Sequence, residues 1–125
     1  MEIATQIEDM ARAAKAASPV VANASVDQRN AALLAIKEAI AEDREAILNA
    51  NERDLEQGRI SGLDEALIDR LALNPARLDS VEEGLIQVAA LADPIGAVSG
   101  LKTMPSGIEV GTMRVPLGVI GIIYE

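Results

Sequence analysis

The chain contains no cysteine and no histidine among its 125 residues. Without cysteine it cannot form a disulfide, supply a thiolate ligand to a metal or offer a thiol nucleophile. Without histidine it lacks the side chain that most often serves as a general base or metal ligand near neutral pH. The sequence therefore predicts no catalytic residue and no metal site in this chain.

Aromatic side chains are almost absent, since Tyr124 is the single one and neither Phe nor Trp occurs. Half of the residues are hydrophobic, so core volume must come from Ala, Leu, Ile and Val. By length we expect one domain, but chains this short bury a smaller fraction of their surface than longer ones. A partner surface would therefore add to the stability of this chain.

Positive charge is also scarce, because 11 Lys and Arg stand against 20 Asp and Glu, which gives a net charge of −9. Binding to a phosphate backbone requires clustered basic side chains, so no nucleic-acid partner is predicted. No apolar run approaches the length of about 20 residues that crosses a membrane. Residues 1–17 include acidic side chains that a secretory signal would not carry. We expect no membrane association and a cytoplasmic location.

Residues 1–93 are predicted to be helical. The first helix has apolar residues at helical spacing, namely Ile3, Ile7, Met10, Ala14 and Ala17. Ser18-Pro19 is predicted to end it, because proline disfavours the helical conformation in the residue before it. Ser25-Val26-Asp27-Gln28 is a capping box that begins the next helical stretch. That stretch is predicted to end with Gly58 as a left-handed cap, and Asp43 leaves open whether it is one helix or two.

Two shorter helices are predicted to follow. Leu63, Leu67 and Leu71 indicate the first of them. Asn74-Pro75 marks the start of the second, with asparagine as N-cap and proline at the first helical position. An apolar stripe then continues to Ala92, and Asp93-Pro94 is predicted to end the helix. This stripe predicts core packing, with a partner-binding helix as the alternative.

Residues 94–125 are predicted to be extended. Glu109–Val115 partly alternates in polarity and indicates a strand. Gly118–Tyr124 is a nearly unbroken apolar run, which is typical of a strand buried on both faces of a parallel sheet. Such a strand needs neighbours and covering helices, so we expect it to open a domain that continues past Glu125. The alternative is a short antiparallel sheet packed on the helices, with this run inside it.

The charged and glycine-rich motifs give little evidence of a site by themselves. Gly118-Val119-Ile120-Gly121 resembles part of a phosphate-binding loop, but the third glycine and the following helix are missing. Glycine within a strand more often indicates close backbone packing. The acidic pairs Glu82-Glu83 and Asp43 with Glu45 are interpreted as solvated helix faces. Arg70 and Arg77 border apolar stripes, where ion pairs with Asp69 or Asp79 are an alternative to plain exposure.

A series of motifs, found in order along the chain, resembles γ-glutamyl phosphate reductases. Residues 114–125, Arg-Val-Pro-Leu-Gly-Val-Ile-Gly-Ile-Ile-Tyr-Glu, are similar to the segment by which that family enters its nucleotide-binding domain. Upstream, Ile47–Asn51 with Asp54 and Leu67–Leu71 with Arg77 are similar to the family's helical region. Leu91–Gly96 matches as well. Several motifs in order are more specific than any one of them.

The resemblance implies an α/β fold of the aldehyde dehydrogenase superfamily, of which this chain is an N-terminal part. That part would comprise about four helices over residues 1–93, then strands over residues 94–125 that lead into a Rossmann-like cofactor domain. The family reduces L-glutamyl 5-phosphate with NADPH to L-glutamate 5-semialdehyde in proline biosynthesis, and the full-length enzyme is expected to be a homo-oligomer. The resemblance places Ile123, Tyr124 and Glu125 at the strand end that approaches the cofactor.

One departure from the family affects activity. These reductases attack the acyl phosphate with a cysteine thiolate, which is strongly nucleophilic near neutral pH. Because this chain has no cysteine, we expect it to be inactive alone. Two alternatives stay open at this point. One is a non-enzymatic, acidic helical module that binds another protein, and the other is a different reductase of the same superfamily.

Overall fold

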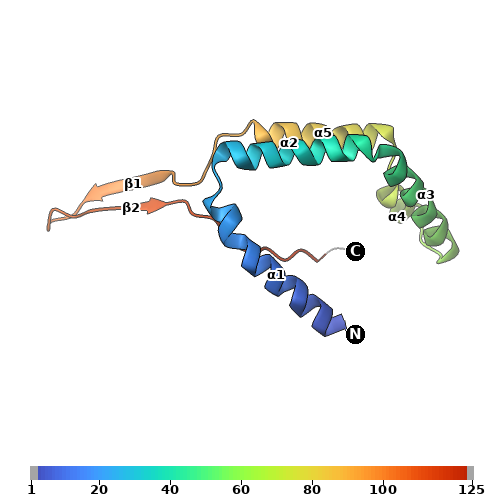
Figure 1. Ribbon diagram of the computed structural model, residues 1–125, viewed down its shortest axis with the longest axis horizontal. Helices are drawn as coiled ribbons and strands as arrows, with labels where there is room; N and C mark the ends of the chain where they lie inside the picture. The colour runs from blue at the N-terminus through green and yellow to red at the C-terminus, as the bar shows by residue number, and fades with distance from the viewer. Residues whose placement is uncertain (1–2, 124–125) are drawn as a thin grey trace. The chain divides into compact units, whose positions relative to one another are not determined.

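The computed structural model describes residues 3–123. Within that range the chain forms five helices followed by two strands, so the prediction of a mostly helical chain with strands at its end is confirmed (Figure 1). The elements are α1 (Ile3–Asn23), α2 (Val26–Glu42), α3 (Arg44–Ile60), α4 (Glu65–Leu71), α5 (Pro75–Ala89), β1 (Val98–Thr103) and β2 (Glu109–Met113). Contacts divide the chain into two compact units, and each is described separately. Residues 27–91 form one, and residues 1–26 with 92–125 form the other.

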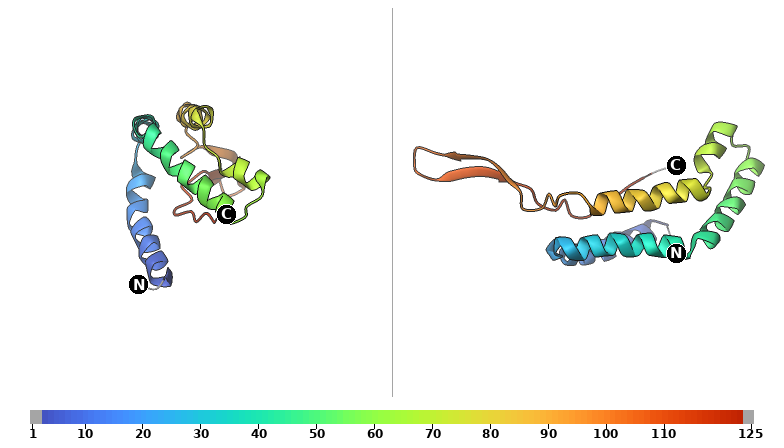
Figure 2. Two further views of the ribbon diagram at one scale, coloured as in Figure 1. Left: turned by 90° about the vertical axis from the view of Figure 1, so that its right-hand side faces the viewer. Right: turned by 90° about the horizontal axis from the view of Figure 1, so that it is seen from above.

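In the unit of residues 27–91, helices α2 and α5 run antiparallel and side by side (Figures 1 and 2). Helix α2 begins directly after Ser25, as the capping motif predicts. Asp43 interrupts the long helical stretch and separates α2 from α3, so the two-helix alternative is confirmed. The predicted cap of α5 is confirmed too, because the Asn74 side chain accepts a hydrogen bond from the backbone N–H of Arg77 at 2.8 Å.

Gly58 does not end α3, which corrects the prediction of a left-handed cap at that residue. The helix continues to Ile60, and the left-handed conformation falls on Gly62, which has a φ of 81°. Gly58 is buried inside the helix. A Cβ atom placed there would lie 3.0 Å from Leu63 Cδ1 and 3.1 Å from Ile68 Cδ1. Glycine at this position therefore allows the chain around α4 to pack closely against α3.

Two other helix ends differ from the prediction. Pro19 lies inside α1, which continues to Asn23. Proline removes one backbone donor but has a helical φ, so a helix can continue through it at a cost of about 3 kcal/mol. In this last turn the Asn23 side chain donates to the Pro19 carbonyl at 2.7 Å. Helix α5 ends at Ala89, four residues before Asp93, so Asp93-Pro94 does not form its end.

The hydrophobic core is small. Among residues 3–123, the large apolar side chains of the core are Ile68 and Leu78, which keep 5% and 3% of their surface exposed. Helix stripes that the sequence predicts to be buried are therefore only partly covered. Leu85 is half-buried, for example, while Val81 and Val88 are exposed on the same helix.

A polar side chain supplies much of the specific contact in this unit. Asn51 lies on the apolar face of α3 and is only 6% exposed. Its Nδ2 donates to the carbonyl of Leu71 at 2.9 Å, and its Oδ1 accepts from the N–H of Leu73 at 2.7 Å. The amide of Asn51 thus mimics a backbone partner and joins α3 to the connection between α4 and α5.

The other unit contains an antiparallel hairpin of β1 and β2 (Figure 1). Sequence analysis predicts the second strand but not the first. The pairing is irregular between Ser99 and Lys102, where Gly100 has a φ of 65°. Opposite it, a Cβ on Gly111 would lie 3.0 Å from the Ser99 carbonyl oxygen. These two glycines permit the bulge, and every residue of both strands is exposed.

Residues 118–123 do not form a strand in this chain. The buried strand predicted over Gly118–Tyr124 belongs to a domain expected to continue past Glu125, so it stays a prediction. Residues 118–123 are irregular and exposed, and Tyr124 lies outside the described residues. The alternative of an antiparallel sheet that contains this run is wrong for residues 118–123, because the observed sheet consists of β1 and β2. A strand requires hydrogen bonds to a neighbouring strand. Within residues 3–123, no strand pairs with this run.

We expect Asn51→Ala to lower the free energy of unfolding by about 2–3 kcal/mol, because it leaves the partly buried Leu73 N–H and Leu71 carbonyl without their partner. Asn49→Ala is the matched control. Asn49 lies on the same helix but is exposed, so its replacement should change stability by less than about 0.5 kcal/mol. Urea denaturation of the full chain measures both. Equal midpoints for the two variants would contradict the role given to Asn51.

Candidate functional site

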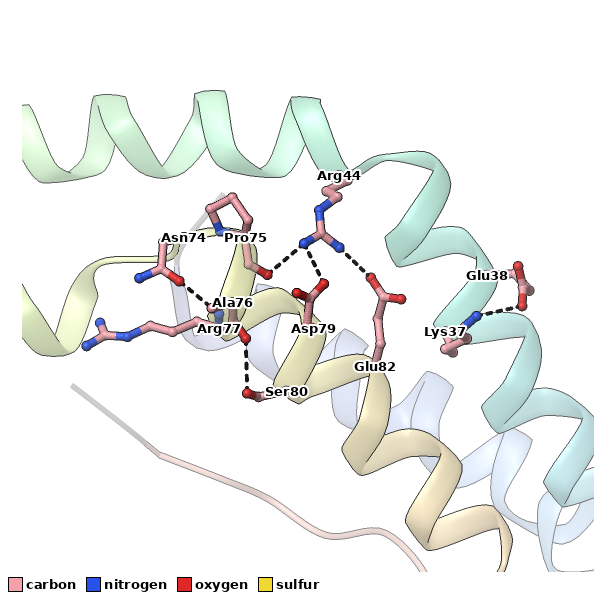
Figure 3. Close-up of polar contacts among 10 residues, drawn as sticks. All are labelled: Lys37, Glu38, Arg44, Asn74, Pro75, Ala76, Arg77, Asp79, Ser80 and Glu82. Carbon is pink, nitrogen blue, oxygen red and sulfur yellow. Dashed lines mark hydrogen bonds and ion pairs between the residues drawn. The ribbon is translucent and has the colours of Figure 1, made fainter.

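Charged side chains gather where α3 meets the start of α5. Arg44, the first residue of α3, donates to three acceptors (Figure 3). One is the Glu82 carboxylate at 3.0 Å, another is the Asp79 carboxylate at 2.6 Å, and the third is the Pro75 carbonyl at 2.6 Å. The Glu82 side chain is only 14% exposed. Glu82 is therefore not the solvated acid that the sequence suggests, and it serves as the partner of Arg44.

A second arginine joins α5 to the end of α4. Arg77 forms an ion pair with the Asp69 carboxylate at 3.0 Å, which confirms one of the predicted pairings. Its guanidinium also donates to the carbonyl of Asp69 and, at 2.6 Å, to the carbonyl of Ala72. The last carbonyls of a helix lack intrahelical partners, so Arg77 satisfies acceptors at the C-terminal end of α4.

Lys37 on α2 lies near this charged group. A hydrogen bond from its Nζ to Glu38 at 3.0 Å, with the charge of that carboxylate, raises the pKa of Lys37 (Figure 3). The more distant charge of Glu82 acts in the same direction, while desolvation opposes it. Lys37 is thus held in its protonated form at neutral pH. It is a poor candidate for a nucleophile or a general base, both of which need the neutral amine.

The arginine contacts are structural in character. Each guanidinium is engaged by acceptors within the unit of residues 27–91. Within residues 3–123, no three acidic side chains converge in a way that could hold a metal ion. In that same range no helix combines the length and the apolar character needed to cross a membrane.

Of the three residues predicted to approach a cofactor, the structure describes Ile123 alone. Ile123 is fully exposed, and Tyr124 and Glu125 lie outside the described residues. NADPH carries phosphate groups that proteins bind through backbone N–H groups at helix N-termini or through basic side chains. Residues 115–123 contain no basic side chain, and none of them belongs to a helix. Residues 115–123 by themselves therefore supply neither kind of phosphate-binding group.

Two solved structures resemble the chain along most of its length. One is a γ-glutamyl phosphate reductase from Thermotoga maritima, which is 36% identical with a TM-score of 0.79 over 86% of this chain. The other is a γ-glutamyl phosphate reductase from Saccharomyces cerevisiae, which is 28% identical with a TM-score of 0.80 over 93% of this chain. No family model matches the sequence.

The chain corresponds to a segment of a γ-glutamyl phosphate reductase. The resemblance that the sequence motifs indicate is thereby confirmed. The chain spans 26% of the Thermotoga reductase and 29% of the yeast reductase. Asn51, Asp69 and Arg77 belong to motifs that carry the resemblance, and they are also residues that join the helices. Part of the motif resemblance therefore falls on residues that pack the helices of this chain.

Sequence analysis does not single out Asn51 or Arg44 as contact residues. A signal for Asn51 is present, because Ile47, Asn51, Leu55 and Gly58 share one face of α3 at helical spacing. A polar side chain on an apolar face calls for a specific partner. Arg44 carries no comparable signal, since its acceptors lie 31 to 38 residues further along the chain.

We expect Arg44→Ala to destabilise the chain by about 2 kcal/mol, because the charge of Glu82 is left shielded from water without its partner. Arg44→Lys should recover less than half of this loss, since an ammonium group cannot reproduce the planar fork that reaches several acceptors. Arg53→Ala, at an exposed position of the same helix, is the control. Thermal unfolding followed by circular dichroism compares the three. Full recovery by lysine would contradict the multidentate role.

The apolar end of the chain generates a prediction about aggregation. Val119, Ile120 and Ile122 are exposed, and uncharged apolar segments with unpaired backbone groups associate readily. Replacing Ile120 and Ile122 together by Lys should lower the static light scattering of the concentrated chain. Gln57→Lys with Gln87→Lys adds the same charge at exposed helical positions and should leave the scattering high. A low signal from the unmodified chain would refute the prediction.

Proposed function

We propose that this chain is part of an NADPH-dependent reductase of the aldehyde dehydrogenase superfamily. The whole enzyme would convert L-glutamyl 5-phosphate to L-glutamate 5-semialdehyde in proline biosynthesis. It would act in the cytoplasm as a homo-oligomer. The observation that carries the proposal is the 36% identity to the Thermotoga reductase, with a TM-score of 0.79 over 86% of this chain. An agreement in both sequence and backbone favours common function over a shared fold alone.

The contribution of this chain to such an enzyme is architectural. Arg44, Arg77 and the carboxylates that they contact serve helix packing. Lys37 is held in its protonated form. The nucleophile that forms a thioester with the acyl group in this family is a cysteine, and this sequence contains none. The chain by itself is therefore inactive, and catalysis requires further polypeptide. NADPH, when bound to the whole enzyme, would supply the hydride.

The proposal accounts for the exposed apolar surface better than a free-standing interaction module does. Large apolar residues are exposed on α1, on both strands and along residues 115–123. A chain that spans 26–29% of its relatives is expected to leave uncovered the surfaces that the remaining polypeptide would bury. The two similar structures described above favour this family over a different reductase of the superfamily, because each is a γ-glutamyl phosphate reductase.

A chimaera tests the proposal. In the Thermotoga reductase, the segment that matches this chain is replaced by residues 1–125. NADPH-dependent conversion of L-glutamyl 5-phosphate is then followed by the loss of NADPH absorbance. We expect the chimaera to retain activity within about tenfold of its parent, which corresponds to a loss of about 1.4 kcal/mol or less in transition-state stabilisation. The isolated chain should show none.

The control is the parent reductase, compared for melting temperature and oligomeric state. A chimaera that matches its parent in both respects but is inactive would argue against a shared function. Activity of the isolated chain would refute the architectural role. The two outcomes are distinct. An inactive chimaera bears on the shared function, whereas an active isolated chain bears on whether catalysis requires further polypeptide.

A further inference from the structure

The helical stretch of residues 26–60 bends at Asp43, where α2 ends and α3 begins (Figures 1 and 2). Asp43 has a φ of −90° and a ψ of 10°, whereas helical residues lie near about −63° and −42°. Sharp bends in helices usually occur at proline, at glycine or serine pairs, at π-bulges or at an inserted side chain. Residues 26–57 contain no proline, glycine, serine or threonine. The composition around the bend therefore does not explain it.

Asp43 retains the backbone hydrogen bonds of a helical residue. Its N–H donates to the Ala39 carbonyl, and its carbonyl accepts from the Ile47 N–H, each at 3.0 Å. Its side chain forms no capping hydrogen bond, so no local contact marks it as the start of a new helix. Hinges are often single residues at the end of an element that absorb a change in φ and ψ. A change between bent and straight forms can therefore occur by rotation at Asp43 alone, with both of these hydrogen bonds kept.

The covered face of α2 continues in phase onto α3. Side chains that are buried or half-buried recur at spacings of four and three residues on both sides of the bend. They are Leu33, Lys37, Ile40, Arg44, Ile47 and Asn51. Such spacing lines one face of a single helix. The sequence of residues 26–60 is thus that of one continuous helix, and the bend comes from contacts with the rest of the unit.

The contacts of Arg44 connect the bend to α5. Arg44 follows Asp43 directly, and its guanidinium reaches Pro75, Asp79 and Glu82, which all belong to α5 (Figure 3). Helix α5 also lies beside α2, on the other side of the bend (Figures 1 and 2). One helix is therefore held against the start of α3 while it packs along α2. In this way α5 sets the direction in which α3 leaves α2.

The other specific contacts of α3 do not involve α2. Asn51 joins α3 to the backbone of Leu71 and Leu73. Gly58 allows Leu63 and Ile68 to approach the same helix closely. These contacts stay in place whatever the angle at the bend, so α3 and α4 form one body. Contacts between α5 and the start of α3 are the ones that a change of this angle would alter.

We propose that Asp43 is a hinge held in its bent form by the contact between Arg44 and α5, and that residues 26–60 become one straight helix when this contact opens. Opening separates α2 from α5, whereas α3 and α4 stay together. The contacts of one arginine thus control the angle between α2 and α3. The proposal rests on residues 26–82 and is independent of the reductase function.

Pairs of spin labels test the hinge in the full chain, because a sequence without cysteine is labelled only at cysteines that are introduced. Ala35→Cys with Glu56→Cys places labels at exposed positions on either side of the bend. A straight helix would separate these two Cα atoms by about 32 Å, so the bent chain should give a shorter distance in pulsed electron spin resonance. Arg53→Cys with Glu65→Cys, at exposed positions of α3 and α4, is the control pair.

Two matched charge variants are then compared, both in the Ile120→Lys, Ile122→Lys background that limits association. Glu82→Lys places a cation beside Arg44, so it should shift most of the distances across the bend to about 32 Å and leave the control distance unchanged. Glu83→Lys makes the same charge change at an exposed position of α5 and should keep the shorter distance.

Equal distances across the bend in the two variants would overturn the proposal, as would a distance of about 32 Å without either substitution. Loss of the control distance in Glu82→Lys would overturn it as well, because the contact would then hold the whole unit together and not the bend alone. An inactive reductase chimaera, by contrast, would reject the proposed function and leave this inference standing.

Discussion

The two hydrogen bonds of Asn51 are the contact on which the helical unit of residues 27–91 depends. They join α3 to the connection between α4 and α5. With one aromatic residue in the sequence, the chain lacks the large side chains that usually fill the space between helices. Directional polar contacts at Asn51, Arg44 and Arg77 fix the helix positions instead. Gly58 contributes by letting Leu63 and Ile68 approach α3 closely.

The sequence predicts the helix starts better than the helix ends. Asn74 and the Ser25 motif lie at or just before real starts, because N-capping depends on a side chain within a few residues. The helix ends predicted at Pro19, Gly58 and Asp93 are wrong. Proline is tolerated inside a helix when few hydrogen bonds are lost. Glycine is tolerated when a neighbouring element packs too closely for a side chain to fit. That neighbour is set by tertiary contacts, which the local sequence does not specify.

The secondary structure of residues 95–123 also depends on contacts that the local sequence does not specify. Strand formation depends on a partner, and an apolar run carries no information on whether one is present. Thus Val98–Thr103 becomes a strand because residues 109–113 pair with it, while residues 118–123 do not. The site prediction stays a prediction. Ile123 is exposed, and the cofactor contacts of Tyr124 and Glu125 rest on the family resemblance alone. Similarity to two reductases covers 86–93% of this chain and supports that resemblance.

Hydrogen exchange of the full chain tests most directly whether polar contacts hold the helical unit together. The informative amide is that of Leu73, which lies outside any helix and donates to Asn51 Oδ1. If this contact is integral to the unit, the Leu73 amide exchanges as slowly as amides in the middle of α3. It should then be far slower than the amides of Val119 and Ile120, which lie in exposed, irregular chain. Exchange of Leu73 at the rate of Val119 would contradict the account, since the Asn51 contact would then open without unfolding the helices.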